Sequence, residues 1–159
     1  MDSGGDLTLL RRAIGLAARS RAAGNHPFGA LVVGANGEVL AEAINGAVPG
    51  KGNATGHAEL EAVRAASAAH PPEVLRAATL YSSAEPCAMC AGAIYWSGIG
   101  RVVYGLSEAR LLALTGSHPE NPTLALPCRE LFARGQRAID VIGPLIEDEA
   151  AAVHAGFWK

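Results

Sequence analysis

His57-Ala58-Glu59 and Pro86-Cys87-Ala88-Met89-Cys90 are the two short stretches that decide the fold of this chain of 159 residues. Together they offer one imidazole and two thiols, from His57, Cys87 and Cys90. Imidazole and thiolate are the ligands that zinc prefers in proteins. Three protein ligands leave one tetrahedral position open, which is typical of a catalytic zinc because a water molecule can occupy it. The two stretches therefore predict a catalytic zinc site.

Glu59 lies two residues after His57, too close along the chain to bind the same ion easily. Zinc lowers the pKa of a bound water from about 15.7 to about 7. A nearby carboxylate can take a proton from this water and pass it to a leaving group. We therefore expect Glu59 to be the catalytic acid and base. The alternative is a structural zinc or an unrelated pair of thiols, because a lone C-x-x-C motif is weak evidence.

The two stretches read H-x-E and P-C-x-x-C, which is the signature of zinc deaminases. On these residues the chain resembles the superfamily of cytidine, cytosine, guanine and tRNA-adenosine deaminases. The resemblance implies a three-layer α/β/α fold of the cytidine deaminase type, in which helices sandwich a mixed five-stranded sheet. It also implies one Zn²⁺ per chain and a homodimer, since deaminases of this type complete their pockets near subunit contacts.

Composition is typical of one globular domain, which we expect to span residues 1–159. Half of the residues are apolar, 18% are charged and the net charge is −2, so no strong electrostatic footprint for nucleic acid is expected. No apolar run reaches the roughly 18 residues that a membrane span needs, and the acidic start, residues 1–6, is unlike a signal peptide. With two cysteines assigned to the metal, Cys128 has no disulfide partner, which favours a reducing, cytoplasmic location.

The pattern of apolar and turn residues predicts an α/β chain of five strands and about five helices. The first helix is expected over residues 7–23, with Asp6 as its N-cap and Gly24 as its stop. Asn36-Gly37 indicates a type I′ hairpin turn between the first two strands. The expected strands are 28–33, 39–44, 79–83, 101–105 and 138–142, and the further helices are 57–70, one that begins at Pro86, a weak one within 106–115, 128–134 and 147–157. Loops are expected over 45–56 and 116–127.

Resemblance to the deaminases also suggests residues that contact the substrate. Asn45 stands 12 residues before His57, where similar enzymes carry an Asn that hydrogen-bonds the base or sugar. The alternative is that Asn45 is a turn residue that closes the second strand. The backbone N–H of Ala58 is expected to donate to an oxygen or ring atom of the base. The backbone carbonyl of Glu85 is expected to accept from the leaving amine.

Two further segments resemble guanine deaminases and related base deaminases. His26-Pro27-Phe28-Gly29-Ala30 resembles their P-F-G-A segment, so His26 and Phe28 are expected beside the base. Phe28 either stacks on the base or packs in the core. Ala93-Ile94-Tyr95-Trp96 also resembles that group, and Trp96 is expected to line the pocket or a dimer contact, with core packing as the alternative.

The tail, residues 147–159, is expected to form a final helix that closes the active site and helps to select the substrate. Glu149 and His154 are its candidate substrate contacts, since a carboxylate accepts from the N–H groups of a base. Phe157-Trp158 either caps a pocket or packs on the sheet. Guanine deaminases carry an acidic residue late in the chain, and Glu120 is a further candidate for that role.

These features favour a hydrolytic deaminase of a free nucleobase or analogue, such as guanine, another aminopurine, cytosine or an aminotriazine. The alternative is a tRNA wobble-adenosine deaminase, whose final strand and helix the tail resembles. Lys159 is the one Lys at that end, however, which is a poor grip for phosphates. The arginines of the first helix either touch phosphates or form a solvated face. A non-catalytic zinc subunit is the third hypothesis. The presence of Glu59 opposes it, and Cys128 as a fourth ligand would support it.

Overall fold

The computed structural model describes residues 3–47 and 52–159. Positions 48–51 of the loop expected over 45–56 lie outside the described residues. The helices of the described part are α1 (Ser3–Ala22), α2 (Ala58–Ala69), α3 (Pro72–Arg76), α4 (Ala88–Ser97), α5 (Glu108–Thr115), α6 (Cys128–Ala133) and α7 (Glu147–Ala152). Its strands are β1 (Gly29–Val33), β2 (Val39–Ile44), β3 (Thr79–Ala84), β4 (Arg101–Leu106) and β5 (Asp140–Ile142).

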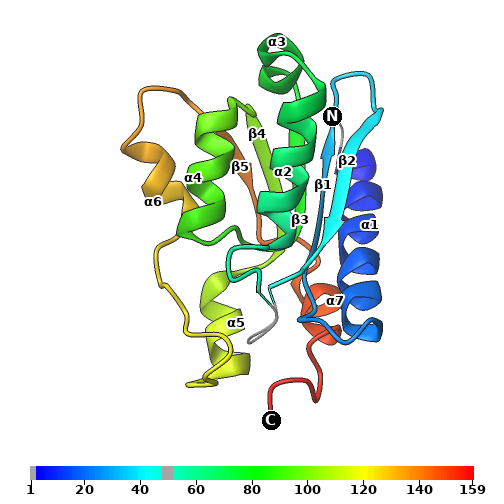
Figure 1. The fold of residues 1–159 in the computed structure, drawn as a ribbon, viewed down its shortest axis with the longest axis vertical. Coiled ribbons are helices and arrows are strands. Elements are labelled where there is room, and N and C mark those ends of the chain that lie inside the picture. Colours follow the sequence, from blue (N-terminus) through cyan, green and yellow to red (C-terminus); the bar gives the residue numbers. More distant parts are fainter. Residues whose placement is uncertain (1–2, 48–51) are drawn as a thin grey trace.

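The strands form one mixed sheet in the order β2-β1-β3-β4-β5, as Figure 1 shows. β1 pairs antiparallel with both β2 and β3, whereas β3, β4 and β5 run parallel to one another. Every residue of β1 and β3 is buried, because helices cover both faces of the sheet at its centre. The parallel strands β3 and β4 end at the same edge, so the segments that follow them lie close together. The expected mixed five-stranded sheet is confirmed.

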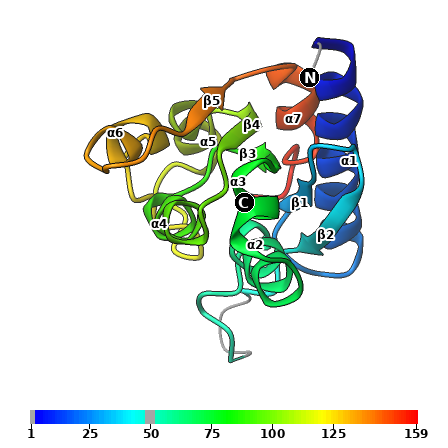
Figure 2. The same ribbon diagram turned by 90° about the horizontal axis from the view of Figure 1, so that it is seen from above.

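Helices cover the two faces of the sheet as separate layers (Figure 2). Helices α1 and α7 lie on one face, where Leu10 and Leu16 pack against Leu31 and Tyr81. Helices α2 and α4 lie on the other face, where their small apolar residues pack with β1, β3 and β4 in the larger core. The three-layer arrangement expected from the sequence is confirmed. None of the helices in the described ranges is long and apolar enough to cross a bilayer.

Three local expectations are wrong. Asp6 does not cap the first helix, because α1 already begins at Ser3 and Asp6 lies inside it. Pro86 precedes α4 rather than opening it, and Cys87 is the N-cap. The final helix α7 ends at Ala152, five residues before the expected end, and the chain continues through turns. Gly24 ends the first helical segment as expected, with a φ of 86°.

The turn between β1 and β2 is also not of type I′. That turn needs a positive φ at both central residues. Gly37 has a φ of 83°, whereas Asn36 is not among the residues with positive φ. The N–H of Gly37 donates to the carbonyl of Gly34 at 2.9 Å, and the pairing of the strands shifts register between Val32 and Val33. The chain therefore turns over residues 34–37, and of Asn36 and Gly37 only the glycine has a left-handed backbone conformation.

A buried ion pair joins the first helix to the sheet. The carboxylate of Asp6 is 4% exposed and accepts two hydrogen bonds from Arg101, at 2.9 and 2.6 Å. The hydroxyl of Tyr81 donates to the same carboxylate at 2.7 Å. The hydrogen bonds from Arg101 lower the pKa of Asp6 most, against burial, which raises it. One side chain of α1 thus connects to both β3 and β4.

Substitution Asp6→Asn should reduce the free energy of unfolding at pH 7 by about 3 kcal/mol, because it leaves the charge of Arg101 with only the exposed Asp140, 3.6 Å away. The folded-state pKa of Asp6 is lowered, so its contribution is complete above the ordinary carboxyl value of about 3.9 and is lost as the pH falls through the lower folded value. Urea unfolding at pH 7 measures the loss of stability, and unfolding at about pH 2.5 measures how much of that loss disappears at low pH. The matched control is Glu149→Gln, which breaks a solvent-exposed pair with Arg11. A difference between Asp6→Asn and wild type that stays constant over this range would contradict the prediction.

Candidate metal centre

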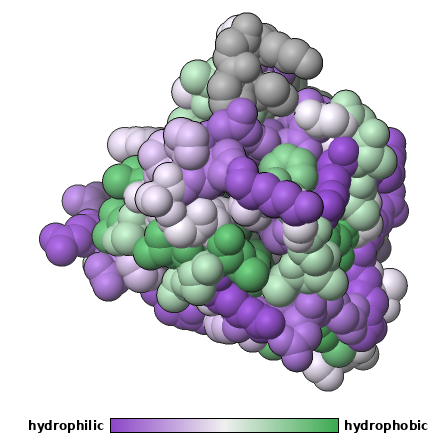
Figure 3. All heavy atoms as spheres, turned by 90° about the horizontal axis from the view of Figure 1, so that it is seen from below, coloured by the Kyte–Doolittle hydropathy of each residue, from purple (hydrophilic) through white to green (hydrophobic). Residues whose placement is uncertain are grey.

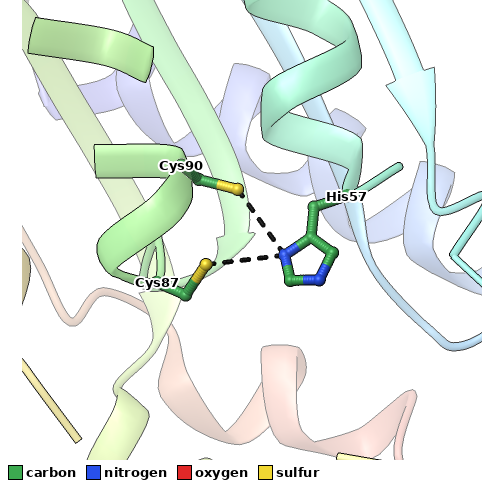
Figure 4. Close-up of side chains that lie close together, drawn as sticks. All are labelled: His57, Cys87 and Cys90. Atoms are coloured by element: carbon green, nitrogen blue, oxygen red, sulfur yellow. Dashed lines mark hydrogen bonds between the residues drawn. The ribbon is translucent and has the colours of Figure 1, made fainter. Parts of the chain in front are cut away.

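The candidate metal ligands are set at the starts of two helices that face each other. His57 is the N-cap of α2 and Cys87 is the N-cap of α4, both in extended backbone conformation. Cys90 follows in the first turn of α4 and is fully buried. Figure 4 shows the three side chains converging, with both sulfurs directed at the His57 ring. Helix N-termini favour thiolate over thiol, so this placement prepares both cysteines for a cation.

The distances between the three ligand atoms fit zinc. His57 Nδ1 lies 3.5 Å from Cys87 Sγ and 3.6 Å from Cys90 Sγ. With Zn–S bonds of about 2.3 Å and Zn–N bonds of about 2.0 Å at a tetrahedral angle, nitrogen and sulfur would lie about 3.5 Å apart. Within residues 3–47 and 52–159, this is the one group of three or more potential ligands close enough for a metal, and Cys128 does not belong to it. Three protein ligands therefore leave the fourth position open, as in catalytic sites.

The electrostatics of the two thiols also suit a cation. The hydrogen bond from Cys90 lowers the pKa of Cys87 to about 4, with a further contribution from His57. The same hydrogen bond, together with burial, raises the pKa of Cys90. The hydrogen bond with Cys87 raises the pKa of His57. Two adjacent thiolates are thus unfavourable without a positive charge between them, which is the charge that a zinc ion supplies.

Glu59 lies directly beside the ligands, in the first turn of α2. Its side chain is buried, with one carboxylate oxygen accepting from Ser82 Oγ at 3.1 Å and the other 4.0 Å from Cys90 Sγ. Burial raises the pKa of Glu59 to about 7, with a further contribution from the negative charge of Cys87. A carboxyl group with this pKa can both accept and release a proton near neutral pH.

A cavity of about 700 Å³ opens next to the three ligands and Glu59. Five of the predicted substrate contacts or candidates line it: His26, Phe28, Asn45, Glu85 and Glu120. The end of the molecule that carries α5 and the C-terminus exposes hydrophobic residues among hydrophilic ones (Figure 3). Leu124, which lines the cavity, is 60% exposed.

Two side chains on the cavity wall are held by partners of their own. The side-chain amide of Asn45 donates to the carbonyl of Ala47 at 3.3 Å. His26 Nε2 lies 3.0 Å from a carboxylate oxygen of Glu120, which ties the loop after α5 to the start of β1. Ala58 is the first residue of α2, where backbone N–H groups have no acceptor within the helix. Asn45 and His26 therefore lie beside the metal centre as expected, and the contacts of these residues and of Ala58 with a substrate are proposals.

The carboxylate of Glu85 connects two helix starts. One oxygen accepts from the backbone N–H of Glu108 at 3.1 Å, and the other accepts from the backbone N–H of Cys128 at 2.9 Å. These residues are the first of α5 and of α6. A negative charge at a helix N-terminus is stabilising because the unpaired N–H groups point toward it. The side chain of Glu85 therefore shapes the cavity wall.

Four predicted substrate contacts are not among the residues that line the cavity: Ala58, whose expected contact is its backbone N–H, and Trp96, Glu149 and His154. Trp96 is 82% exposed on α4. Glu149 accepts two hydrogen bonds from Arg11 at 2.9 and 3.0 Å, because α7 packs beside α1 on the opposite face of the sheet. His154 is buried with its ring 5.3 Å from that of Phe28, and it accepts a hydrogen bond from Trp158 at 3.0 Å. The side chains of Glu149 and His154 therefore lie outside the cavity wall.

The end of the tail packs behind the cavity wall instead. Trp158 stacks on His154 with an interplanar angle of 17°. Its ring also makes edge contacts with the rings of His26 and His118, at centroid distances of 5.1 and 5.3 Å. The aromatic residues thus support the wall from outside through His26, in place of the direct pocket contact that was one expectation.

Glu108 and Leu111 line the cavity but were not among the predicted site residues. A signal for Glu108 exists in the sequence. It follows β4 closely, as Glu85 follows β3, and parallel strands end at the same edge of a sheet. The loop 121–124 carries no comparable signal, because its place on the wall depends on how the chain folds back after α5.

The chain belongs to the cytidine and deoxycytidylate deaminase family. Residues 4–106 match the family profile described as the cytidine and deoxycytidylate deaminase zinc-binding region. This range contains His57, Glu59 and both zinc-binding cysteines, so the match covers the whole metal centre. The protein is therefore a zinc-binding deaminase, a hydrolase of C–N bonds.

Individual relatives include enzymes with different substrates. A probable cytosine deaminase of Schizosaccharomyces pombe is 44% identical over 153 residues, which are 96% of this chain and 92% of the relative. A tRNA-specific adenosine deaminase of Haemophilus influenzae is 36% identical over 109 residues, 69% of this chain and 62% of the relative. The structure of a guanine deaminase from Nitrosomonas europaea superposes with a TM-score of 0.72 at 31% identity, covering 92% of this chain and 80% of that one.

Replacement of Cys87 by Ala should abolish stoichiometric zinc binding, because two ligands hold the ion far less tightly than three. Thermal stability should fall as well, since metal-binding energy is also folding energy. Elemental analysis of purified protein measures the metal, and a thermal melt measures the stability. The control Cys128→Ala removes a buried thiol outside the metal centre and should keep one zinc per chain. A fully zinc-loaded Cys87→Ala protein would refute the ligand assignment.

Proposed function

We propose that this deaminase acts on a free nucleobase or a close analogue, such as cytosine, guanine, another aminopurine or an aminotriazine. The charge of the cavity supports this proposal most. The carboxyl side chains on its wall are Glu59, Glu85, Glu108 and Glu120, and no Lys or Arg is among the wall residues that the structure describes. Carboxylates repel phosphate groups and accept hydrogen bonds from the N–H and amino groups of an uncharged base.

The relatives support the same substrate class. The S. pombe relative that aligns with nearly the whole chain is named a probable cytosine deaminase. The guanine deaminase of N. europaea has a similar structure. A pyrimidine and a purine both fit within a cavity of about 700 Å³, so the cavity volume is compatible with either base.

The proposed contacts follow from the positions of the side chains. Phe28 offers an aromatic face on which a flat ring can stack. Asn45 offers an amide that can both donate to and accept from the base. The backbone carbonyl of Glu85 is proposed to accept from the leaving amine, and the backbone N–H of Ala58 to donate to the base. Together these groups would orient the amino-bearing carbon toward the metal centre.

The proposed reaction exchanges the amino group of the base for the oxygen of a water molecule, with release of ammonia. A zinc ion held by His57, Cys87 and Cys90 supplies Lewis-acid activation of water at neutral pH. Glu59 is proposed to pass one proton of the water to the ring nitrogen as the oxygen adds to carbon, then to take the second proton from the added hydroxyl and deliver it to the amine, so that the C–N bond breaks, ammonia leaves and a carbonyl forms. Its pKa of about 7 suits both directions of transfer.

A tRNA-adenosine deaminase is the second candidate, because the H. influenzae relative carries that name. The first helix does not favour it. Arg11 and Arg12 pair with Glu149 and Glu42, at 2.9 and 2.7 Å. Arg21 donates to the backbone carbonyls of two tail residues. Arginines that are already paired within the protein are poorly placed to neutralise phosphates.

A homodimer is a further part of the proposal. Trp96 was expected either to line the pocket or to lie in a dimer contact, and it lies outside the cavity. Its side chain is 82% exposed, which is compatible with burial by a second subunit. The single domain over residues 1–159, the cytoplasmic location and the closure of the active site by the tail remain predictions.

Substitution Glu59→Ala should lower kcat by at least about 10⁴-fold, the upper end for one acid and base, because the same group moves more than one proton. Zinc content and the folded state should persist, since Glu59 is not a ligand. Stopped assays of ammonia release on the best substrate measure kcat, with elemental analysis in parallel. A kcat within about tenfold of the wild-type value would mean that another residue carries the protons.

A screen of ammonia release should identify a free base or analogue as a better substrate than a tRNA anticodon stem-loop. The panel contains cytosine, guanine, an aminotriazine, cytidine, guanosine and the stem-loop, each with Glu59→Ala as the blank. Binding of the stem-loop at two salt concentrations adds a second test, because phosphate-dominated binding weakens steeply with salt. Tight, salt-sensitive binding and faster deamination of the stem-loop would overturn the nucleobase proposal.

A further inference from the structure

Glu108 lines the cavity, and one of its carboxylate oxygens has no hydrogen-bond partner among the described residues. It is the first residue of α5, it lines the cavity and it is 9% exposed. Its Oε2 is buried, and no hydrogen-bond partner for it exists among the residues that the structure describes. Buried polar atoms in folded proteins are nearly always hydrogen-bonded, so an exception in a cavity points to a missing ligand.

The surroundings of Glu108 make this oxygen a strong acceptor in need of a donor. Burial raises the pKa of Glu108 to about 7, and the charges of Glu85 and Cys87 raise it further in the same direction. The wall residues that the structure describes include no Lys or Arg that could pair with this carboxylate. A hydrogen bond donated by a bound molecule would relieve this penalty.

The side chain of Glu108 is not required to build its own helix. The hydroxyl of Ser107 caps α5 by accepting from the N–H of Arg110 at 3.2 Å. The backbone N–H of Glu108 donates to Glu85 at 3.1 Å, and the backbone N–H of Ser107 donates to Glu147 at 2.7 Å. These contacts fix the position of Glu108 without using its carboxyl group. That group is therefore available for a ligand.

Glu108 and Asn45 flank the metal centre from opposite sides. Asn45 follows β2 and Glu108 follows β4, and β1 and β3 lie between these strands in the sheet. Glu59 is bonded to Ser82 on β3, which places the reaction centre between them. A base bound at this centre would present one of its edges to Asn45 and another to Glu108.

We propose that Glu108 is a specificity-determining residue, whose free carboxyl oxygen accepts a hydrogen bond from a ring N–H of an unsubstituted base. The inference rests on the proposed function and specifies it further. In a free base the nitrogen that would carry a sugar bears a hydrogen, which a carboxylate can bind. In a nucleoside the same nitrogen bears carbon and cannot donate. Glu108 thereby favours free bases over nucleosides, because the substituted form leaves its buried oxygen unpaired.

The test compares each base with its methylated form, cytosine with 1-methylcytosine and guanine with 9-methylguanine. The zinc-loaded enzyme is measured as wild type, Glu108→Ala and Glu108→Asp. The Asp variant keeps a negative charge at the start of α5 but withdraws it by one methylene. The matched control is Glu130→Gln, which alters an exposed carboxylate in the first turn of the neighbouring helix α6.

Wild type should prefer the unsubstituted base. Both Glu108 variants should lose about 10- to 100-fold in kcat/KM on that base, the range for a hydrogen bond to a charged group. Activity on the methylated base should change by less than about threefold, since it makes no such bond, so the preference between the two substrates should largely disappear. Zinc content and the thermal midpoint should stay at wild-type values, and Glu130→Gln should behave as wild type throughout.

Equal losses on both forms of the base, or no loss on either, would overturn the assignment of Glu108 while leaving the nucleobase proposal intact. If wild type releases ammonia from tRNA or nucleosides but from no free base, the proposed function fails and this inference fails with it. The wild-type measurements alone separate these two results, before any variant is compared.

Discussion

The need to bring one imidazole and two thiols within bonding distance of a single ion fixes how α2 and α4 pack. Both helices must begin at the same edge of the sheet, with their first turns face to face. Small residues make this close approach possible, because Ala62, Ala66 and Ala91 are fully buried in the core shared by the two helices. The metal centre and the helical layer are thus one structure, and a bulky substitution on this face would separate the ligands.

The metal centre was predictable because its determinants are local. His57 and Glu59 are near neighbours, as are Cys87 and Cys90, so two short motifs specify the types and relative positions of the ligands. The strands and most helices were predictable for the same reason, since apolar spacing and turn residues act over a few positions. The family resemblance then supplied the sheet, whose order no local pattern reveals.

The remaining features depend on contacts between distant segments. Asp6 is of a residue type that often caps helices. Its actual partner, Arg101, is 95 residues away, and the sequence gives no sign that the two meet inside the protein. Glu149 resembles a substrate-binding carboxylate until Arg11, 138 residues earlier, is found beside it. Glu108 was overlooked because an acidic residue at a helix start has an ordinary structural explanation. Its place just after β4 is visible in the sequence, but its unpaired oxygen is a property of the folded state.

The position of Glu85 has a consequence for how enzymes of this kind diversify. The carboxylate of Glu85 accepts from the first residues of both α5 and α6. The chain between these two residues is therefore attached at both ends to the segment that precedes Cys87. Residues 116–127 lie between those attachment points, so a change in this loop would alter the cavity wall and the contact of Glu120 with His26 without removing the attachment points. The loop is therefore a natural unit for exchange between homologues, and a protein engineer can graft it as a cassette provided that position 85 remains acidic.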